Sequence, residues 1–154
     1  AAAEELEAAW VPSYGPEMRG GTANCPVIVS DGRIGAPLVE RPSEVIVMNR
    51  AALAKFEPAT APGGIVFVNS SIVSEKVQRT DVRAIYVPCD EIAAELGNTK
   101  VANMVMLGAY VAATGALKQA TIETMIQEMF TGPKAKLVPL NIEAFHRGMA
   151  CVAE

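Results

Sequence analysis

The chain has 154 residues, of which 51% are hydrophobic and 19% charged, with a formal net charge of −4 and a mean hydropathy of +0.25. This length suits one domain with a substantial core, and the acidic balance argues against a nucleic-acid-binding surface. The longest uncharged run, residues 101–117, is too short to predict a membrane span, so we expect neither nucleic acid nor a membrane as a partner.

The three cysteines, Cys25, Cys89 and Cys151, are odd in number and far apart in the sequence. They form neither a CxxC pair nor a cluster with metal-ligand spacing. We therefore expect free thiols in a reducing compartment and no metal site. No signal-peptide pattern precedes an apolar stretch, which favours a cytoplasmic protein.

The first third of the chain combines a helical and a strand-like pattern. Residues 1–9 are rich in Ala, Glu and Leu and predict a helix that lacks an N-cap. Residues 26–30 are β-branched and predict a strand. Residues 34–39 are expected to pair back as a hairpin arm, at a sheet edge because Pro37 has no N–H to donate.

The middle third alternates buried strands with short helices. Asn49 is predicted to cap a helix over residues 50–56, and Asp90 one over residues 91–96. Continuous apolar runs of this kind are typical of parallel strands, and we expect three of them: residues 44–48, 65–68 and 82–87. The rhythm predicts an α/β fold, a three-layer α/β/α arrangement with a mostly parallel, Rossmann-like sheet.

The last third is predicted to be helical. Residues 99–114 are apolar all round, which indicates a helix buried on more than one side. Residues 121–130 carry an amphipathic stripe at helical spacing. Asn141 is expected to cap a terminal helix.

No residue pattern predicts a catalytic site. His146 is the only histidine, and we interpret it as a solvated helix residue. The chain has no GxGxxG motif for a dinucleotide. Asn69 and Ser70 follow a predicted strand, where parallel sheets bind ligands, but a turn or N-cap role explains them equally well.

The segment over residues 13–25 concentrates Pro, Gly, an acid, a base and an aromatic between two apolar runs. The guanidinium of Arg19 and the backbone amides of Gly20 and Gly21 suit an anion or a partner protein. A glycine-rich connector whose side chains meet only water explains the composition as well. The residues alone leave both interpretations open.

Residues 11–25, VPSYGPEMRGGTANC, resemble the corresponding motif of the gamma subunit of 2-oxoacid:ferredoxin oxidoreductases, of the pyruvate, 2-oxoglutarate and 2-ketoisovalerate types. The resemblance continues in order through EIAAELGN at residues 91–98 and ANMVMLGA at residues 102–109. The family usually opens with a strand and a GxGGQG turn, whereas this chain begins within the helix that follows. We therefore expect a single, N-terminally truncated gamma-type domain over residues 1–154.

The resemblance implies a subunit that is inactive alone. The family enzyme oxidatively decarboxylates a 2-oxoacid with coenzyme A (CoA) to acyl-CoA and CO2 and reduces ferredoxin. Thiamine diphosphate, Mg and 4Fe–4S clusters are expected in the alpha, beta and delta partner subunits, and no cofactor in this chain.

The resemblance also implies which residues face a partner subunit or the CoA side of the site. These candidates are Tyr14, Glu17, Arg19, Gly20, Gly21, Asn24, Asn69, Ser70 and Asn103. The alternatives are a stand-alone α/β domain that binds a small molecule without catalysis, and a carrier or regulatory domain.

Overall fold

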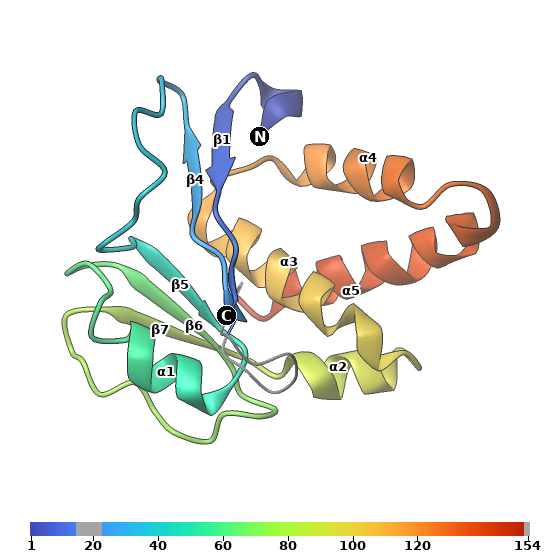
Figure 1. The fold of residues 1–154 in the computed structure, drawn as a ribbon. Coiled ribbons are helices and arrows are strands. Elements are labelled where there is room, and N and C mark those ends of the chain that lie inside the picture. The colour runs from blue at the N-terminus through green and yellow to red at the C-terminus, as the bar shows by residue number, and fades with distance from the viewer. Residues whose placement is uncertain (15–22, 153–154) are drawn as a thin grey trace. The chain divides into compact units, whose positions relative to one another are not determined.

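A computed structural model of the chain describes residues 1–14 and 23–152 (Figure 1). By its internal contacts the chain divides into two compact units, Ala1–Arg41 and Pro42–Glu154. The single domain expected over residues 1–154 stays a prediction.

The first unit is built from short antiparallel strands. A 3-10 helix, η1 (Ala2–Glu4), precedes β1 (Glu7–Trp10), which pairs with β4 (Val27–Ser30) as the strand prediction for residues 26–30 requires. The helix predicted over residues 1–9 is wrong. A segment of nine residues without an N-cap is too short to hold a helix by propensity alone, and cross-strand pairing with β4 decides its conformation.

The antiparallel pairing continues beyond the β1–β4 pair, past Trp10 and Val27. There β2 (Ser13–Tyr14) pairs with β3 (Ala23–Asn24), also antiparallel. Between the two pairs the N–H of Val11 donates to the carbonyl of Pro26 at 3.2 Å. Pro12 and Pro26, which have no N–H to donate, lie between the two strand pairs. We call residues 7–14 and 23–30 together the β arm.

Residues 34–39 do not form the strand that was expected. The segment is irregular, and the N–H of Ile34 donates to Oε2 of Glu7 at 2.8 Å. Gly35 has no strand preference and Pro37 has no N–H, so these six residues cannot sustain a ladder.

The second unit begins with a parallel three-stranded sheet in the order β5-β6-β7. Its strands are β5 (Glu44–Val47), β6 (Ile65–Asn69) and β7 (Arg83–Val87). Between the first two lies helix α1 (Arg50–Phe56), whose N-cap Asn49 accepts a hydrogen bond from the N–H of Ala52 at 2.9 Å. The three predicted strands and the Asn49 cap are confirmed.

Helices make up the rest of this unit. They are α2 (Cys89–Glu95), η2 (Thr99–Val101), α3 (Ala102–Thr114), α4 (Gln119–Met129), η3 (Gly132–Leu137) and α5 (Val138–Ala150). The helical prediction for the last third is confirmed, but Asn141 does not cap the terminal helix. The helix begins three residues earlier, beside Pro139, and the buried Asn141 side chain donates to the carbonyl of Leu137 at 2.8 Å.

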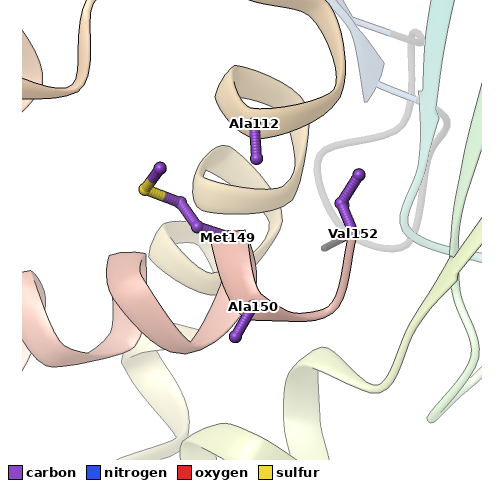
Figure 2. Close-up of a pocket in the computed structure, with 4 residues that line it drawn as sticks. All are labelled: Ala112, Met149, Ala150 and Val152. Atoms are coloured by element: carbon purple, nitrogen blue, oxygen red, sulfur yellow. The ribbon is translucent and has the colours of Figure 1, made fainter. Parts of the chain in front are cut away.

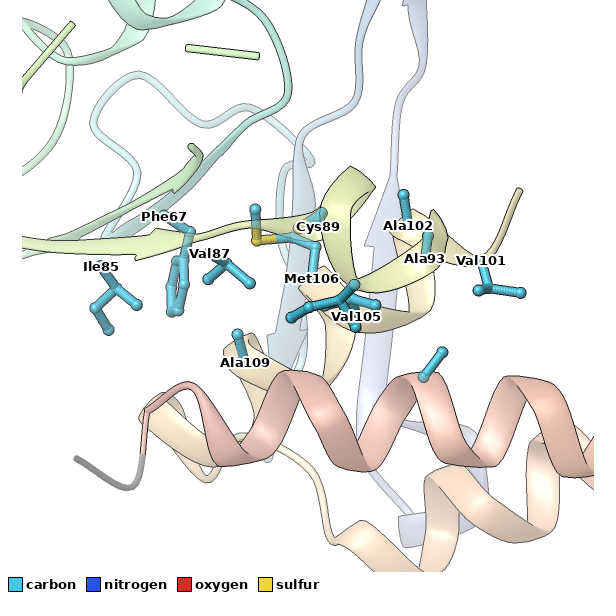
Figure 3. Close-up of a cluster of buried hydrophobic side chains, with 12 residues drawn as sticks. Phe67, Ile85, Val87, Cys89, Ala93, Val101, Ala102, Val105, Met106 and Ala109 are labelled. Atoms are coloured by element: carbon cyan, nitrogen blue, oxygen red, sulfur yellow. The ribbon is translucent and has the colours of Figure 1, made fainter. Parts of the chain in front are cut away.

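The two faces of the parallel sheet are covered by different helices. Val66 and Val68 pack with Leu53 of α1 on one face. Phe67 and Ile85 point to the other face and pack with residues of α2 and α3 (Figure 3). This arrangement confirms the three-layer α/β/α prediction for the second unit.

Helices α3 and α5 cross with their backbones in close contact. A Cβ on Gly108 would lie 1.9 Å from the carbonyl oxygen of Phe145, and one on Gly148 would lie 1.8 Å from that of Val105. Only glycine permits this approach. None of the described helices is long and apolar enough to cross a bilayer.

Candidate functional site

Two of the predicted contact residues, Tyr14 and Asn24, lie at the end of the β arm. Tyr14 in β2 is paired with Ala23, and the half-buried Asn24 in β3 is paired with Ser13. Strand pairing therefore holds together the two ends of the segment that carries the family motif. Its other predicted residues, Glu17, Arg19, Gly20 and Gly21, lie outside the described residues.

A polar network occupies the carboxyl end of β6. The side chain of Asn69 is fully buried, and its Nδ2 donates to Oδ2 of Asp90 at 2.6 Å. Its Oδ1 accepts from the N–H of Ser71 at 3.3 Å, while the N–H of Ser70 donates to the carbonyl of Val87 at 2.9 Å. The side-chain amide of Asn69 thus links the last residue of β6 to the first turn of α2, which is a structural role.

Ser71 completes this network by capping α2 from outside the helix. Its Oγ accepts from the N–H of Asp90 at 3.1 Å and from the N–H of Glu91 at 3.2 Å. The prediction that Asp90 itself caps the helix is wrong, because its carboxylate is engaged by Asn69 instead. No sequence signal reveals a cap that comes from a residue 19 positions upstream.

Asn103 lies apart from these groups. It is exposed in the first turn of α3, and its Oδ1 accepts a hydrogen bond from the N–H of Met104 at 2.9 Å. Among the described residues, no hydrogen bond joins Asn103 to Asn69 or Ser70. The structure therefore brings Asn69 and Ser70 together with Asp90 and Ser71, and leaves Asn103 outside that network.

His146 is exposed on α5 and is hydrogen-bonded to Glu123 of α4. Its Nε2 lies 2.6 Å from Oε1 of Glu123, which also accepts from Nε2 of Gln119 at 2.7 Å. These bonds, the one to His146 first, lower the pKa of Glu123. The interpretation of His146 as a solvated helix residue agrees with this exposed position.

The three cysteines differ in exposure. Cys25 is exposed, Cys89 is buried and Cys151 is half-buried, and no disulfide joins any two of them. Burial raises the pKa of the Cys89 thiol to about 12, so the thiol stays protonated at neutral pH. Within residues 1–14 and 23–152, no three His, Cys, Asp or Glu side chains are grouped so that they could hold a metal ion.

A hollow of about 290 Å³ lies at the C-terminal ends of α3 and α5. Ala112, Met149, Ala150 and Val152 line it, as Figure 2 shows. Small-molecule sites combine an apolar wall with a few polar groups that fix the orientation of the ligand. The side chains of this hollow are all apolar, so they cannot orient a polar substrate.

Comparison with known proteins places the chain in a family. Residues 1–151 match the model of the family described as pyruvate ferredoxin/flavodoxin oxidoreductase. The ketoisovalerate oxidoreductase subunit VorA of Methanothermobacter thermautotrophicus is 37% identical over 150 residues, which are 96% of this chain and 31% of VorA. The chain thus spans about a third of the length of that relative.

Other relatives are closer to this chain in length. The 2-oxoglutarate synthase subunit KorC of Methanocaldococcus jannaschii is 32% identical, over 98% of this chain and 80% of KorC. The crystal structure of the gamma subunit of a keto/oxoacid ferredoxin oxidoreductase from Geobacter sulfurreducens aligns with a TM-score of 0.79 and 27% identity, over 99% of this chain and 84% of that one. With the family match over nearly its whole length, the chain belongs to the pyruvate ferredoxin/flavodoxin oxidoreductase family.

Proposed function

We propose that the chain is the gamma part of a multi-subunit 2-oxoacid:ferredoxin oxidoreductase. The complex decarboxylates a 2-oxoacid, transfers the acyl group to CoA and passes the electrons to ferredoxin. The observation that carries this proposal is the family match over residues 1–151, together with a gamma-subunit fold over 99% of the chain. The complex is expected in the cytoplasm.

The chemical steps belong to the partners of this chain. We assign thiamine diphosphate, Mg and the 4Fe–4S clusters to the alpha, beta and delta subunits. For this chain we assign a packing and binding role. The thiol of Cys89 is held protonated by burial and is not available as a nucleophile.

The segment over residues 13–25 is the part of the chain that we assign to contact with CoA or with a partner subunit. A guanidinium and glycine amides are suited to the phosphates of CoA. The pairing of β2 with β3 supports this assignment, because it fixes both ends of the segment on one arm.

A variant of Arg19 distinguishes contact with CoA from contact with a partner subunit. If Arg19 faces CoA, Arg19→Ala raises the KM for CoA about tenfold or more and leaves subunit assembly intact, since a charge-assisted hydrogen bond contributes roughly 1.5–3 kcal/mol. If it faces a partner subunit, the variant complex dissociates more readily and the KM for CoA is unchanged. Arg33→Ala, in an exposed residue of the same unit, is the control. An unchanged KM and unchanged assembly contradict both assignments.

The stand-alone binding domain has less support. The hollow between α3 and α5 has only apolar side chains in its lining, and the polar groups of Asn69 and Ser71 at the sheet edge bond to the protein itself.

Affinity purification of the native chain tests the proposal against this alternative. Thiamine-diphosphate-binding subunits that co-purify in fixed stoichiometry support it. A monomer that binds a small molecule by itself, without such subunits, contradicts it.

A further inference from the structure

One face of the β1–β4 pair carries only apolar side chains. Because side chains alternate along a strand, Ala8 and Trp10 of β1 share a face with Val29 and Val27, their cross-strand partners. All four residues are exposed, Trp10 to 67% and Val27 to 59%. We call these four residues the Trp10 face.

The opposite face of the β1–β4 pair differs from the Trp10 face in composition and exposure. Glu7 and Ala9 share this face with Ser30 and Ile28, again as cross-strand partners. Oε2 of Glu7 accepts the N–H of Ile34 at 2.8 Å, and both Ala9 and Ile28 are half-buried. Ala9 and Ile28 are therefore less exposed than the four residues of the Trp10 face.

An exposed apolar face on a two-stranded arm is expected to pack against another protein surface. Two strands alone are marginally stable in water and need a surface to pack on. Contiguous exposed apolar side chains commonly mark protein interaction sites, and tryptophan is among the residues that dominate binding energy at their centres. The Trp10 face contains no charged residue, so its complement is an apolar surface.

We propose that the Trp10 face docks on an apolar surface of the subunits that complete the oxidoreductase. This inference rests on the proposed function. The matched stretch makes up 80% of the separate subunit KorC but only 31% of the longer VorA. A domain that occurs both as its own subunit and within a longer chain needs a permanent contact with the rest of the enzyme. Permanent interfaces are more apolar than transient ones, and the Trp10 face is apolar throughout.

The chain provides its own reporter, because Trp10 is its only tryptophan. The full-length native chain is labelled with 5-hydroxytryptophan and mixed with the unlabelled partner subunits. The label is excited at wavelengths that ordinary tryptophan does not absorb. We expect its emission to shift to the blue and its quenching by acrylamide to fall at least threefold on assembly.

Matched variants test whether the apolar character of the face is what binds. Val27→Thr with Val29→Thr keeps β-branched side chains and strand propensity, while it places two hydroxyls on the Trp10 face. We expect this pair, and Trp10→Ala, to weaken assembly by about ten- to a hundredfold. Leu38→Ala is the control, since Leu38 is 82% exposed in the same unit but lies outside the arm.

The outcomes separate this inference from the proposed function. A complex that assembles while Trp10 stays exposed, and that tolerates the double Thr variant, overturns the docking proposal and leaves the proposed function intact. A Trp10 that is buried in the isolated chain, against its own residues or a second copy, overturns it as well. Failure of the wild-type chain to bind thiamine-diphosphate-containing subunits contradicts the proposed function itself.

Discussion

The difference in exposure between Cys25 and Cys89 predicts which of the two thiols is alkylated. Cys25 is exposed, whereas burial, with a smaller contribution from Asp90, raises the pKa of Cys89 to about 12. At pH 8 we expect iodoacetamide to alkylate Cys25 within minutes and to leave Cys89 unmodified, because the thiolate is the reactive form. Peptide mass spectrometry of native and urea-denatured protein measures this. Equal modification of both residues in the native protein contradicts the structure.

The Glu123–His146 pair predicts a small dependence of stability on pH. Hydrogen bonds from His146 and Gln119 lower the pKa of Glu123 from its ordinary value of 4.5. The stabilisation is therefore present above pH 4.5 and is lost as the pH falls through the lowered folded-state value. Because both side chains are partly exposed, Glu123→Gln should cost less than about 1 kcal/mol at pH 6.

Urea unfolding at pH 6 and at pH 3 measures this difference, with Glu128→Gln on the same helix as the control. We expect the Glu123→Gln variant and the wild type to differ less in free energy of unfolding at the lower pH. A difference that stays constant across this range contradicts the assignment.

At the scale of the elements, the α3–α5 crossing depends on two glycines. Gly148→Ala places a methyl group 1.8 Å from the carbonyl oxygen of Val105, so the helices must separate. We expect the free energy of unfolding to fall by about 2–4 kcal/mol, and Gly108→Ala to have a similar effect. Gly35→Ala, with no atom within 4 Å of the new methyl group, is the control and should change stability by less than about 0.5 kcal/mol. A Gly148→Ala protein as stable as the control refutes the close packing.

The sequence predicts correctly those helices and strands whose determining residues are adjacent in the chain. Helix α1 begins after Asn49 as predicted, because the cap and the helix are adjacent in the sequence. The strand at residues 7–10 was missed since its Ala- and Glu-rich residues favour a helix, and only pairing with β4, about 20 residues away, makes them a strand. An Asn before an apolar run predicts an N-cap, so Asn141 was expected at the start of the helix. The helix instead begins at Val138, with a Pro in its first turn, and Asn141 lies inside it.

In the candidate site too, features set by adjacent residues could be predicted, and contacts between distant residues could not. The sequence places Asn69 and Ser70 after a strand, and β6 does end at Asn69. The hydrogen-bond partner of Asn69 could not be predicted, because Asn69 bonds a carboxylate 21 residues away. Such a contact depends on the parallel crossover between strands, which no short motif encodes.

For the molecule as a whole, the family match and the fold point to one part of a larger enzyme. The described residues bury their apolar side chains in the three layers of the second unit, while the first unit presents an arm with an open apolar face. In the function proposed above, such a subunit contributes surface and position to a reaction whose cofactors are assigned to its partners. Its absence should therefore abolish the activity of the complex without removing those cofactors.

Reconstitution of the oxidoreductase with and without this chain tests that claim most directly. Purified partner subunits, loaded with thiamine diphosphate and iron–sulfur clusters, are assayed for ferredoxin reduction that depends on both a 2-oxoacid and CoA. We predict little activity without the chain and at least a tenfold increase when it is added in equimolar amount. Full activity of the partner subunits alone, unchanged by the added chain, would contradict the account.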